Sequence, residues 1–272
     1  MGEAGVTAGV LNTQEVAAEG ASPAAWMAML HGIYGAGRNW GSVARGLVAA
    51  RPEWGALLVD LRQHGGSMGF PPPHTLTATA ADLESLAAPG PLRAVLGHSF
   101  GGKVALAYAR GAEAVAQVWV VDSTPEVREP EGGAWNMLEI LRRVPDRFGE
   151  RDEAVAALVR KGVRKPIAAW MTTNLEWTGE EYRWRLDLDE METLLRSFFE
   201  TDLWDVVESP PERLTVHVIR ATESSVLGDD AAARIRAAGE ATGRVHLHDV
   251  QGAHWLNADN PEALVSLLAE RL

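Results

Sequence analysis

Short apolar runs recur along the chain and alternate with segments whose apolar residues follow a helical period. Six runs have the length and aliphatic content of buried parallel strands: residues 26–30, 56–60, 92–96, 117–121, 214–219 and 245–250. The expected helices are residues 42–50, 75–88, 100–110, 229–241 and 261–272. The last has Asn260 in position for an N-cap and Pro261 at its first residue. This alternation predicts an α/β fold, a mostly parallel sheet flanked by helices, with ligands bound beyond the carboxyl ends of the strands.

One long segment, residues 125–211, interrupts the alternation. It contains no convincing strand, but helical patterns occur at residues 152–161 and 190–199. We therefore expect a core domain formed by residues 1–124 and 212–272, with a helical cap, or lid, inserted at residues 125–211. Half of the chain's ten tryptophans lie in this expected cap: Trp135, Trp170, Trp177, Trp184 and Trp204.

Aromatic side chains of this kind can cover an apolar pocket. Trp135 and Trp170 of the cap, with Tyr34 of the core, are the candidate substrate-binding residues. They fit an apolar acyl group and an aromatic group equally well. The alternative is that these rings only pack the cap against itself and against the core.

Composition narrows the classes of partner. With 25 basic against 37 acidic residues the net charge is -12, which opposes binding to nucleic acid. No apolar stretch approaches the roughly 18 residues of a membrane span, so no membrane insertion is expected. Residues 1–20 lack the parts of a secretory signal, so we expect a cytoplasmic location. The chain has no cysteine, which excludes disulfides, thiolate metal ligands and a cysteine nucleophile.

Cofactor and metal motifs are weak in this sequence. Neither a P-loop nor a dinucleotide-binding glycine spacing occurs, so no cofactor is predicted. His246 and His248 share one face of an expected strand, but without a third ligand they do not predict a metal site. The expected partner is a small-molecule substrate, and the sequence leaves the oligomeric state open.

A G-x-S-x-G motif at residues 97–101 follows one expected strand and leads into an expected helix. At such a turn, small neighbours allow a strained backbone that lifts the serine hydroxyl clear of the sheet and points the next N–H at the substrate. Ser99 is therefore the candidate nucleophile. The alternative is a serine that only caps the helix.

A serine nucleophile needs a base and donors for the oxyanion. His254 follows the last expected strand in a short loop, which places its imidazole at the same sheet edge as Ser99. The glycine-rich loop 31–37 follows the first expected strand, and its glycines let N–H groups turn toward a negative oxygen. The N–H groups of Ile33 and Phe100 are the expected donors of the oxyanion hole.

The acid that orients the base has two candidates. Asp122 ends the expected strand 117–121, and Glu223 follows the expected strand 214–219. Asp122 is favoured, although an aspartate here could instead cap the beginning of the inserted segment.

The order His-Gly-x-x-Gly, Gly-x-Ser-x-Gly, Asp and His resembles the α/β-hydrolase superfamily. More narrowly, five segments are similar to the small bacterial acyl-ester and acyl-CoA esterases and their mitochondrial relatives: residues 31–40, 60–67, 97–104, 120–125 and 254–256. The resemblance covers most of the core and not the cap, and Ala221 stands where that branch usually has glycine. It implies an α/β-hydrolase fold, and it supports Asp122 as the acid.

These residues together predict a serine hydrolase that cleaves carboxylic esters or thioesters through Ser99, Asp122 and His254, by way of an acyl-enzyme. The same scaffold hosts acyltransferases, lactonases, cofactor-free haloperoxidases and carbon–carbon bond hydrolases, so these reactions stay open. Dehalogenases and epoxide hydrolases have an aspartate as the nucleophile in the turn between strand and helix. We call this turn, residues 97–101, the elbow, and here it carries Ser99. The alternative outside the enzymes is a ligand receptor, which retains the three residues but turns over its ligand very slowly.

Overall fold

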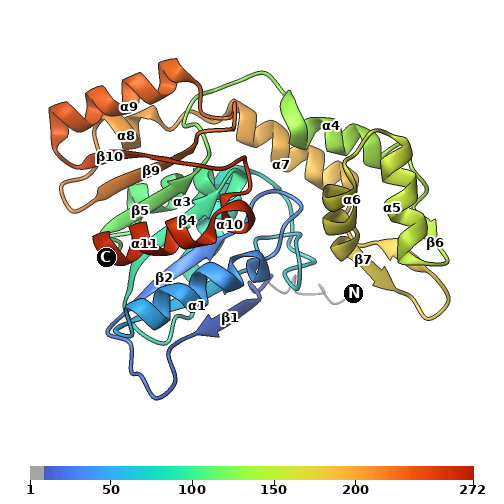
Figure 1. The fold of residues 1–272 in the computed structure, drawn as a ribbon, viewed down its shortest axis with the longest axis horizontal. Helices are drawn as coiled ribbons and strands as arrows, with labels where there is room; N and C mark the ends of the chain where they lie inside the picture. The colour runs from blue at the N-terminus through green and yellow to red at the C-terminus, as the bar shows by residue number, and fades with distance from the viewer. Residues whose placement is uncertain (1–8) are drawn as a thin grey trace, which may run out of the picture.

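A twisted seven-stranded sheet runs through the core of the protein, described over residues 9–272 by a computed structural model (Figure 1). Its strands are β1 (Thr13–Val16), β2 (Ala25–Leu30), β3 (Trp54–Val59), β4 (Leu92–His98), β5 (Gln117–Val121), β9 (Thr215–Ala221) and β10 (Val245–Val250). They lie in the order β1-β3-β2-β4-β5-β9-β10, and every pair is parallel except β1 with β3. Each strand predicted from an apolar run is present, with ends that differ by at most about two residues.

Helices follow most of these strands. Those of the core are α1 (Gly41–Ala50), α2 (Leu76–Asp82), α3 (Phe100–Gly111), α9 (Asp229–Thr242), α10 (Leu256–Asp259) and α11 (Pro261–Arg271), with 3-10 turns η1 (Gly37–Trp40) and η2 (Leu83–Ser85). The Asn260 side chain accepts a hydrogen bond from the Ala263 N–H, which confirms it as the N-cap of α11. The helix expected over residues 75–88 is too long, because α2 and η2 end before the prolines at 89 and 91 disfavour further helix.

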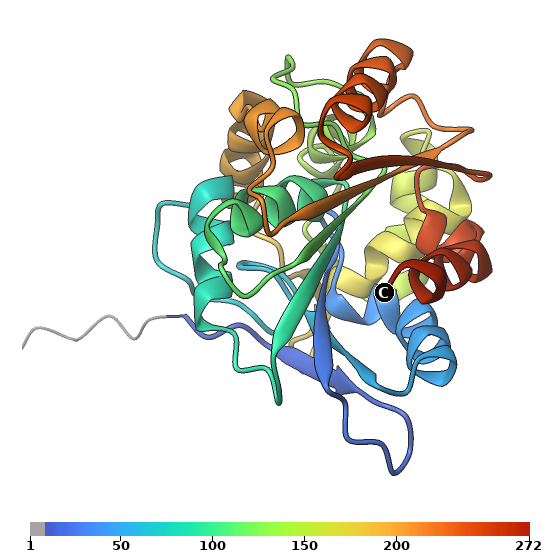
Figure 2. The same cartoon turned by 90° about the vertical axis from the view of Figure 1, so that its left-hand side faces the viewer.

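Both faces of the sheet are buried, because alternate residues of the central strands join two different apolar clusters. In β2, Met27 and Met29 belong to the cluster that contains residues of α1 and α11, whereas Ala28 and Leu30 belong to the cluster that contains residues of α2, α3 and α9. Figure 2 shows α1 and α11 on one side of the sheet and α2 and α3 on the other. The predicted α/β architecture, a mostly parallel sheet flanked by helices, is therefore confirmed.

The inserted segment, residues 125–211, leaves the core after β5 and returns before β9. Its helices are α4 (Gly132–Leu141), α5 (Arg151–Arg160), α6 (Lys165–Met171), η3 (Thr172–Asn174), α7 (Leu188–Glu200) and α8 (Trp204–Glu208), and α4, α5 and α6 lie to one side of the main sheet (Figure 1). The expectation of no strand here is wrong. A small antiparallel sheet, in the order β6-β8-β7, is formed by β6 (Arg147–Phe148), β7 (Leu175–Trp177) and β8 (Tyr182–Trp184). These strands are too short and too rich in charged residues to form an apolar run.

The amino-terminal strand β1 has no counterpart among the predicted strands. β1 pairs antiparallel with β3 at the edge of the sheet, where the side chains of a strand are less buried. Polar residues are tolerated there, and Thr13, Gln14 and Glu15 are polar. Residues 1–8, part of the segment in which no secretory signal was expected, lie outside the described residues. From residue 9 onward, no helix is both long enough and apolar enough to cross a membrane.

Candidate active site

Ser99 occupies a strained turn between β4 and α3. Its φ angle is +52°, a left-handed conformation that costs a non-glycine residue on the order of 1–3 kcal/mol. The Ser99 N–H donates to the Val121 carbonyl at 3.0 Å, which joins the turn to β5. A Cβ atom at Gly97 would overlap the Gly101 carbonyl, and one at Gly101 would lie 2.5 Å from the His31 carbonyl oxygen, so both positions require glycine. The turn has the geometry that the G-x-S-x-G motif predicts.

His254 and Asp122 meet at the same edge of the sheet. Nδ1 of His254 lies 2.7 Å from Oδ2 of Asp122, whose side chain is fully buried, whereas the His254 side chain is 32% exposed. The second carboxylate oxygen of Asp122 accepts the Ala221 N–H at 3.3 Å. Because a carboxylate only accepts, the neutral imidazole carries its proton on Nδ1 and leaves Nε2 as an acceptor. Glu223 is exposed and makes no ion pair with His254 in the described structure.

His98, the residue before Ser99, holds the loop of the base against the elbow. Its Nε2 donates to the His254 carbonyl at 2.7 Å, since a carbonyl can only accept. The two imidazole rings pack with centroids 4.5 Å apart. Burial lowers the pKa of His98 well below its ordinary value, so this imidazole is neutral near pH 7. The candidate base is thereby positioned by a residue of the G-x-S-x-G motif itself.

The glycine-rich loop at residues 31–37, called the oxyanion loop here after its expected role, is the second part of the candidate site. The N–H groups of Ile33 and Phe100 have no acceptor within residues 9–272. Phe100 begins α3, where N–H groups lack a partner in the helix and the dipole favours a negative charge. Two buried imidazoles fix the loop, because His31 Nε2 accepts the Leu61 N–H at 3.0 Å and His64 Nε2 accepts the Tyr34 N–H at 3.2 Å.

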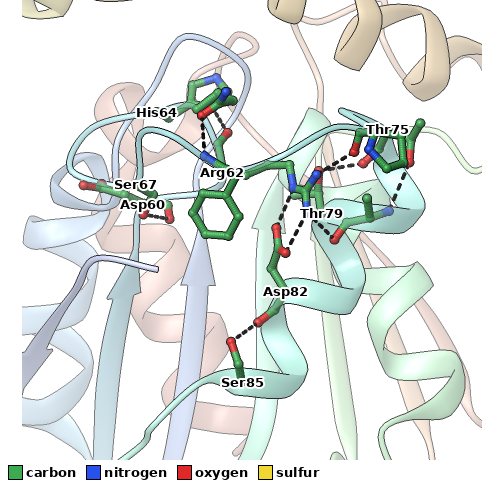
Figure 3. A network of polar contacts seen from close by, with 12 residues as sticks. Asp60, Arg62, His64, Ser67, Thr75, Thr79, Asp82 and Ser85 are labelled. Carbon is green, nitrogen blue, oxygen red and sulfur yellow. Dashed lines mark hydrogen bonds and ion pairs between the residues drawn. The ribbon is translucent and has the colours of Figure 1, made fainter. Parts of the chain in front are cut away.

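A second loop, residues 60–67, supports the oxyanion loop, and Figure 3 shows its residues Asp60, Arg62, His64 and Ser67. The Asp60 carboxylate accepts the Gly37 N–H at 2.7 Å and the Gly66 N–H at 2.8 Å. Burial alone would raise the pKa of Asp60, but these hydrogen bonds outweigh it and the pKa is lowered. Arg62 makes a two-pronged ion pair with Asp82 of α2, at 2.6 and 2.7 Å, which Figure 3 shows. The oxyanion loop is therefore held by a network of buried polar groups.

Tyr34, a candidate substrate-binding residue, joins the oxyanion loop to the inserted segment. Its φ angle is +63°, and its side chain is 2% exposed. The hydroxyl donates to the Ala134 carbonyl of α4 at 3.0 Å, and Asn174 Nδ2 donates to the Tyr34 carbonyl at 2.9 Å. Burial raises the pKa of the phenol, so it stays a donor. A direct role of Tyr34 in substrate binding stays a prediction.

The two candidate tryptophans have different surroundings. Trp170 packs against Trp255, the residue after His254, with ring centroids 5.4 Å apart. Trp135 packs edge-on against Phe199 at 6.3 Å, so its described aromatic contact lies within the inserted segment. The structure therefore brings Trp170 next to the loop of the base and gives Trp135 no such contact.

Two residues beside the elbow were not among the candidate site residues predicted from the sequence. The Phe198 ring lies 6.0 Å from the Phe100 ring, and the buried Lys103 lies in the helix that begins with Phe100. The helical pattern of residues 190–199 was a signal for Phe198, although it does not say which face meets the core. Lysine usually indicates an exposed position, so no signal was available for Lys103.

The histidines of β9 and β10 form a stacked group. His217 lies flat on Trp119, with centroids 3.9 Å apart and planes 7° apart, and its Nδ1 lies 3.1 Å from His248 Nε2. The His246 ring is 5.0 Å from that of His217. Over the part of the chain that the structure describes, no cluster of three or more histidine, aspartate and glutamate side chains could hold a metal ion.

Buried neutral histidines predict a loss of stability in acid. Burial lowers the pKa of His31 to about 4, and of His64 and His217 to about 3, from an ordinary value of 6.5. Below pH 6.5 the unfolded chain binds protons that the folded chain does not, so the free energy of unfolding falls as the pH falls. Each group contributes about 1.4 kcal/mol per pH unit, and the three together about 4 kcal/mol between pH 5.5 and 4.5.

Urea unfolding followed by tryptophan fluorescence at several pH values measures this slope. The variant His217→Phe keeps a ring on Trp119 but removes one titrating group, and we expect it to reduce the slope by about 1.4 kcal/mol per pH unit. A free energy of unfolding that stays constant from pH 6.5 to 4.5 would contradict the burial of neutral imidazoles.

Comparison with known proteins shows the family to which this chain belongs. The model of the alpha/beta hydrolase family matches residues 27–267, and the chain belongs to this family. The sn-1-specific diacylglycerol lipase ABHD11 of Danio rerio is 25% identical over 250 residues, which cover 88% of this chain and 76% of that protein. Its Mus musculus counterpart is 32% identical over 174 residues, 60% of this chain and only 55% of that protein. The resemblance to the α/β-hydrolase superfamily is therefore confirmed.

Solved structures agree on the fold. A marine microorganism esterase superposes with a TM-score of 0.81 at 22% identity. The superposition covers 97% of this chain and 100% of the esterase chain. An esterase from Mycobacterium tuberculosis superposes with a TM-score of 0.65 at 20% identity. The superposition covers 98% of this chain and 92% of that esterase chain. At these identities the likeness shows the fold alone.

Proposed function

We propose that this protein is a serine hydrolase that cleaves carboxylic esters or thioesters through Ser99, Asp122 and His254. The observation that carries the proposal is the 2.7 Å contact between His254 Nδ1 and the fully buried Asp122 carboxylate, at the sheet edge where the strained turn presents Ser99. A carboxylate on Nδ1 leaves Nε2 free to act as a base, which is what a serine nucleophile requires.

In the proposed reaction, His254 Nε2 takes the proton of Ser99 as the serine oxygen attacks the ester carbonyl carbon. The Ile33 and Phe100 N–H groups hold the resulting oxyanion. The imidazolium gives its proton to the leaving alcohol or thiol, and the acyl group stays on the serine. A water molecule, activated by the same imidazole, then releases the acid. Within residues 9–272 the His254 imidazole is hydrogen-bonded to Asp122 and not to Ser99, so the proposed transfer requires the serine hydroxyl to turn toward Nε2.

In this proposal the inserted segment, residues 125–211, serves as the cap of a core formed by residues 1–124 and 212–272. Besides the hydrogen bonds at Tyr34, two aromatic contacts join it to the site: Phe198 packs on Phe100, and Trp170 packs on Trp255. Such surroundings favour an apolar acyl or aromatic group on the substrate. The lipase and esterase activities that the relatives' names state agree with a substrate of this class.

A panel of p-nitrophenyl and CoA acyl esters, from acetyl to decanoyl, tests this function. We expect turnover with an optimum chain length. We also expect a fluorophosphonate to inactivate the protein by transferring its phosphonyl group to Ser99 with loss of fluoride, which adds the mass of the reagent less HF to the peptide that contains Ser99. Protein treated with the fluorophosphonate is the control for background hydrolysis. If the folded protein hydrolyses none of these esters, the proposal fails, and a non-ester substrate or a receptor role takes its place.

A further inference from the structure

Lys103 lies one helical turn after Ser99 on α3, and it is only 1% exposed. Its Nζ donates to three backbone carbonyl oxygens, those of Glu126 at 2.7 Å, Phe198 at 2.7 Å and Thr201 at 2.8 Å. An ammonium group has three N–H donors, so each one is used. The Phe198 ring also lies over the cation, with its centroid 4.7 Å from Nζ.

These carbonyls belong to the two connections between the inserted segment and the core. One connection leaves the core after β5, and the other is the carboxyl end of α7. Backbone hydrogen bonds join the two, from the Leu203 N–H to the Pro125 carbonyl at 2.8 Å and from the Arg128 N–H to the Phe199 carbonyl at 2.9 Å. We call the paired connections the hinge: residues 125–128 and 198–203.

The position of the cation has a physical reason. The last carbonyls of α7 have no partner within the helix and form the negative end of its dipole. Lys103 satisfies the Phe198 carbonyl of this last turn, the Thr201 carbonyl that directly follows the helix, and the Glu126 carbonyl of the outgoing connection. Because Lys103 belongs to α3, both connections are bound to the helix that begins with a proposed oxyanion donor.

We propose that Lys103 is a positioning residue, whose charged amine binds the hinge to α3 and so holds the inserted segment over the acyl site. Phe198 connects the two, since its carbonyl binds Lys103 and its ring packs 6.0 Å from the Phe100 ring. Release of the amine should let Phe198 move away from Phe100 and weaken acyl binding, while the triad keeps its own contacts. The inference rests on the proposed function only for its kinetic readout.

The hinge depends on the charge of this amine. Burial lowers the pKa of Lys103 to about 8; Asp202 and Glu126 act to raise it, and Arg128 acts to lower it. These three are the charged groups of the hinge that face the amine. A neutral amine has only two N–H groups for three carbonyls, so one hydrogen bond is lost and a lone pair faces an oxygen. We therefore expect the hinge to loosen as the pH rises through about 8.

Amide hydrogen exchange tests the hinge without any substrate. In Lys103→Met we expect faster exchange in residues 125–128 and 198–203 than in the wild type. Lys161→Met, which changes an exposed lysine of the inserted segment, is the matched control and should leave the exchange of the hinge unchanged. In the wild type, hinge exchange should rise between pH 7 and 9 by more than the intrinsic pH dependence of the exchange reaction.

Kinetics separate positioning from a general loss of structure. With an acyl ester that the wild type hydrolyses, Lys103→Met should raise KM on the order of ten- to a hundredfold while kcat changes little, because acyl binding and not the triad is disturbed. The wild-type KM should rise above about pH 8, and Lys103→Arg, which stays charged, should lack this rise.

Unchanged hinge exchange in a folded Lys103→Met protein would overturn the proposal. Wild-type hinge exchange that follows only the intrinsic rate between pH 7 and 9 would overturn it as well, and this measurement needs no variant that folds. A protein that hydrolyses no ester would overturn the proposed function, and the exchange results would still decide the role of Lys103.

Discussion

Alanine in place of Ser99 is expected to lower kcat by about a millionfold, because the attacking oxygen is lost while the oxyanion donors and the substrate-binding surface remain. Alanine carries a Cβ atom as serine does, so the turn at φ +52° and the fold should be retained. Steady-state hydrolysis of the best p-nitrophenyl ester measures the loss, and thermal unfolding of the same preparation checks the fold.

Ser266→Ala is the matched control for this substitution. Ser266 is an exposed serine within α11, so its replacement should leave both kcat and thermal stability near the wild-type values. Substantial turnover by a folded Ser99→Ala protein would mean that another residue is the nucleophile, and the proposed mechanism would be wrong.

Asparagine in place of Asp122 is expected to lower kcat by up to about 10,000-fold. The carboxylate accepts the proton on His254 Nδ1 at 2.7 Å and also accepts the Ala221 N–H. An amide keeps the shape of the side chain but presents an NH2 group, which favours the other tautomer of the imidazole. In that tautomer Nε2 carries the proton and cannot take one from Ser99. The kcat at pH 7 to 8, compared with the wild type, measures this loss.

Glu223→Gln is the comparison that decides between the two candidate acids. Glu223 is exposed, so its replacement should change kcat by less than about tenfold. A greater loss in Glu223→Gln than in Asp122→Asn would reverse the assignment of the acid. Thermal unfolding of both variants shows whether either loss comes from the fold.

The sheet could be predicted because buried parallel strands are apolar on both faces and appear as continuous runs. The strands at residues 117–121 and 245–250 agree with the prediction at both ends. Strand β1 could not be found in this way, since an edge strand with polar residues has no apolar run. The strands of the inserted segment, such as Arg147–Phe148, depend on pairing with distant residues, which leaves little local signal.

The candidate site could be predicted as far as it depends on strand ends. Ser99, Asp122 and His254 follow β4, β5 and β10, and parallel topology alone brings such positions to one edge. The partners of Lys103 and Tyr34 are backbone carbonyls of the inserted segment. Every residue has a carbonyl, so residue identity cannot indicate which one is bound. These contacts could be found only in three dimensions.

Residues 125–128 and 198–203 are joined by backbone hydrogen bonds. The chain between them therefore leaves the core and comes back at nearly the same place. The entropy of closing a chain segment grows only slowly with its length. The core therefore accepts a longer, shorter or differently folded module between these two stretches without a large loss of stability. If the inserted segment serves as the proposed cap, we expect its exchange to alter the substrate range, while the proposed triad residues, which all lie in the core, stay as they are.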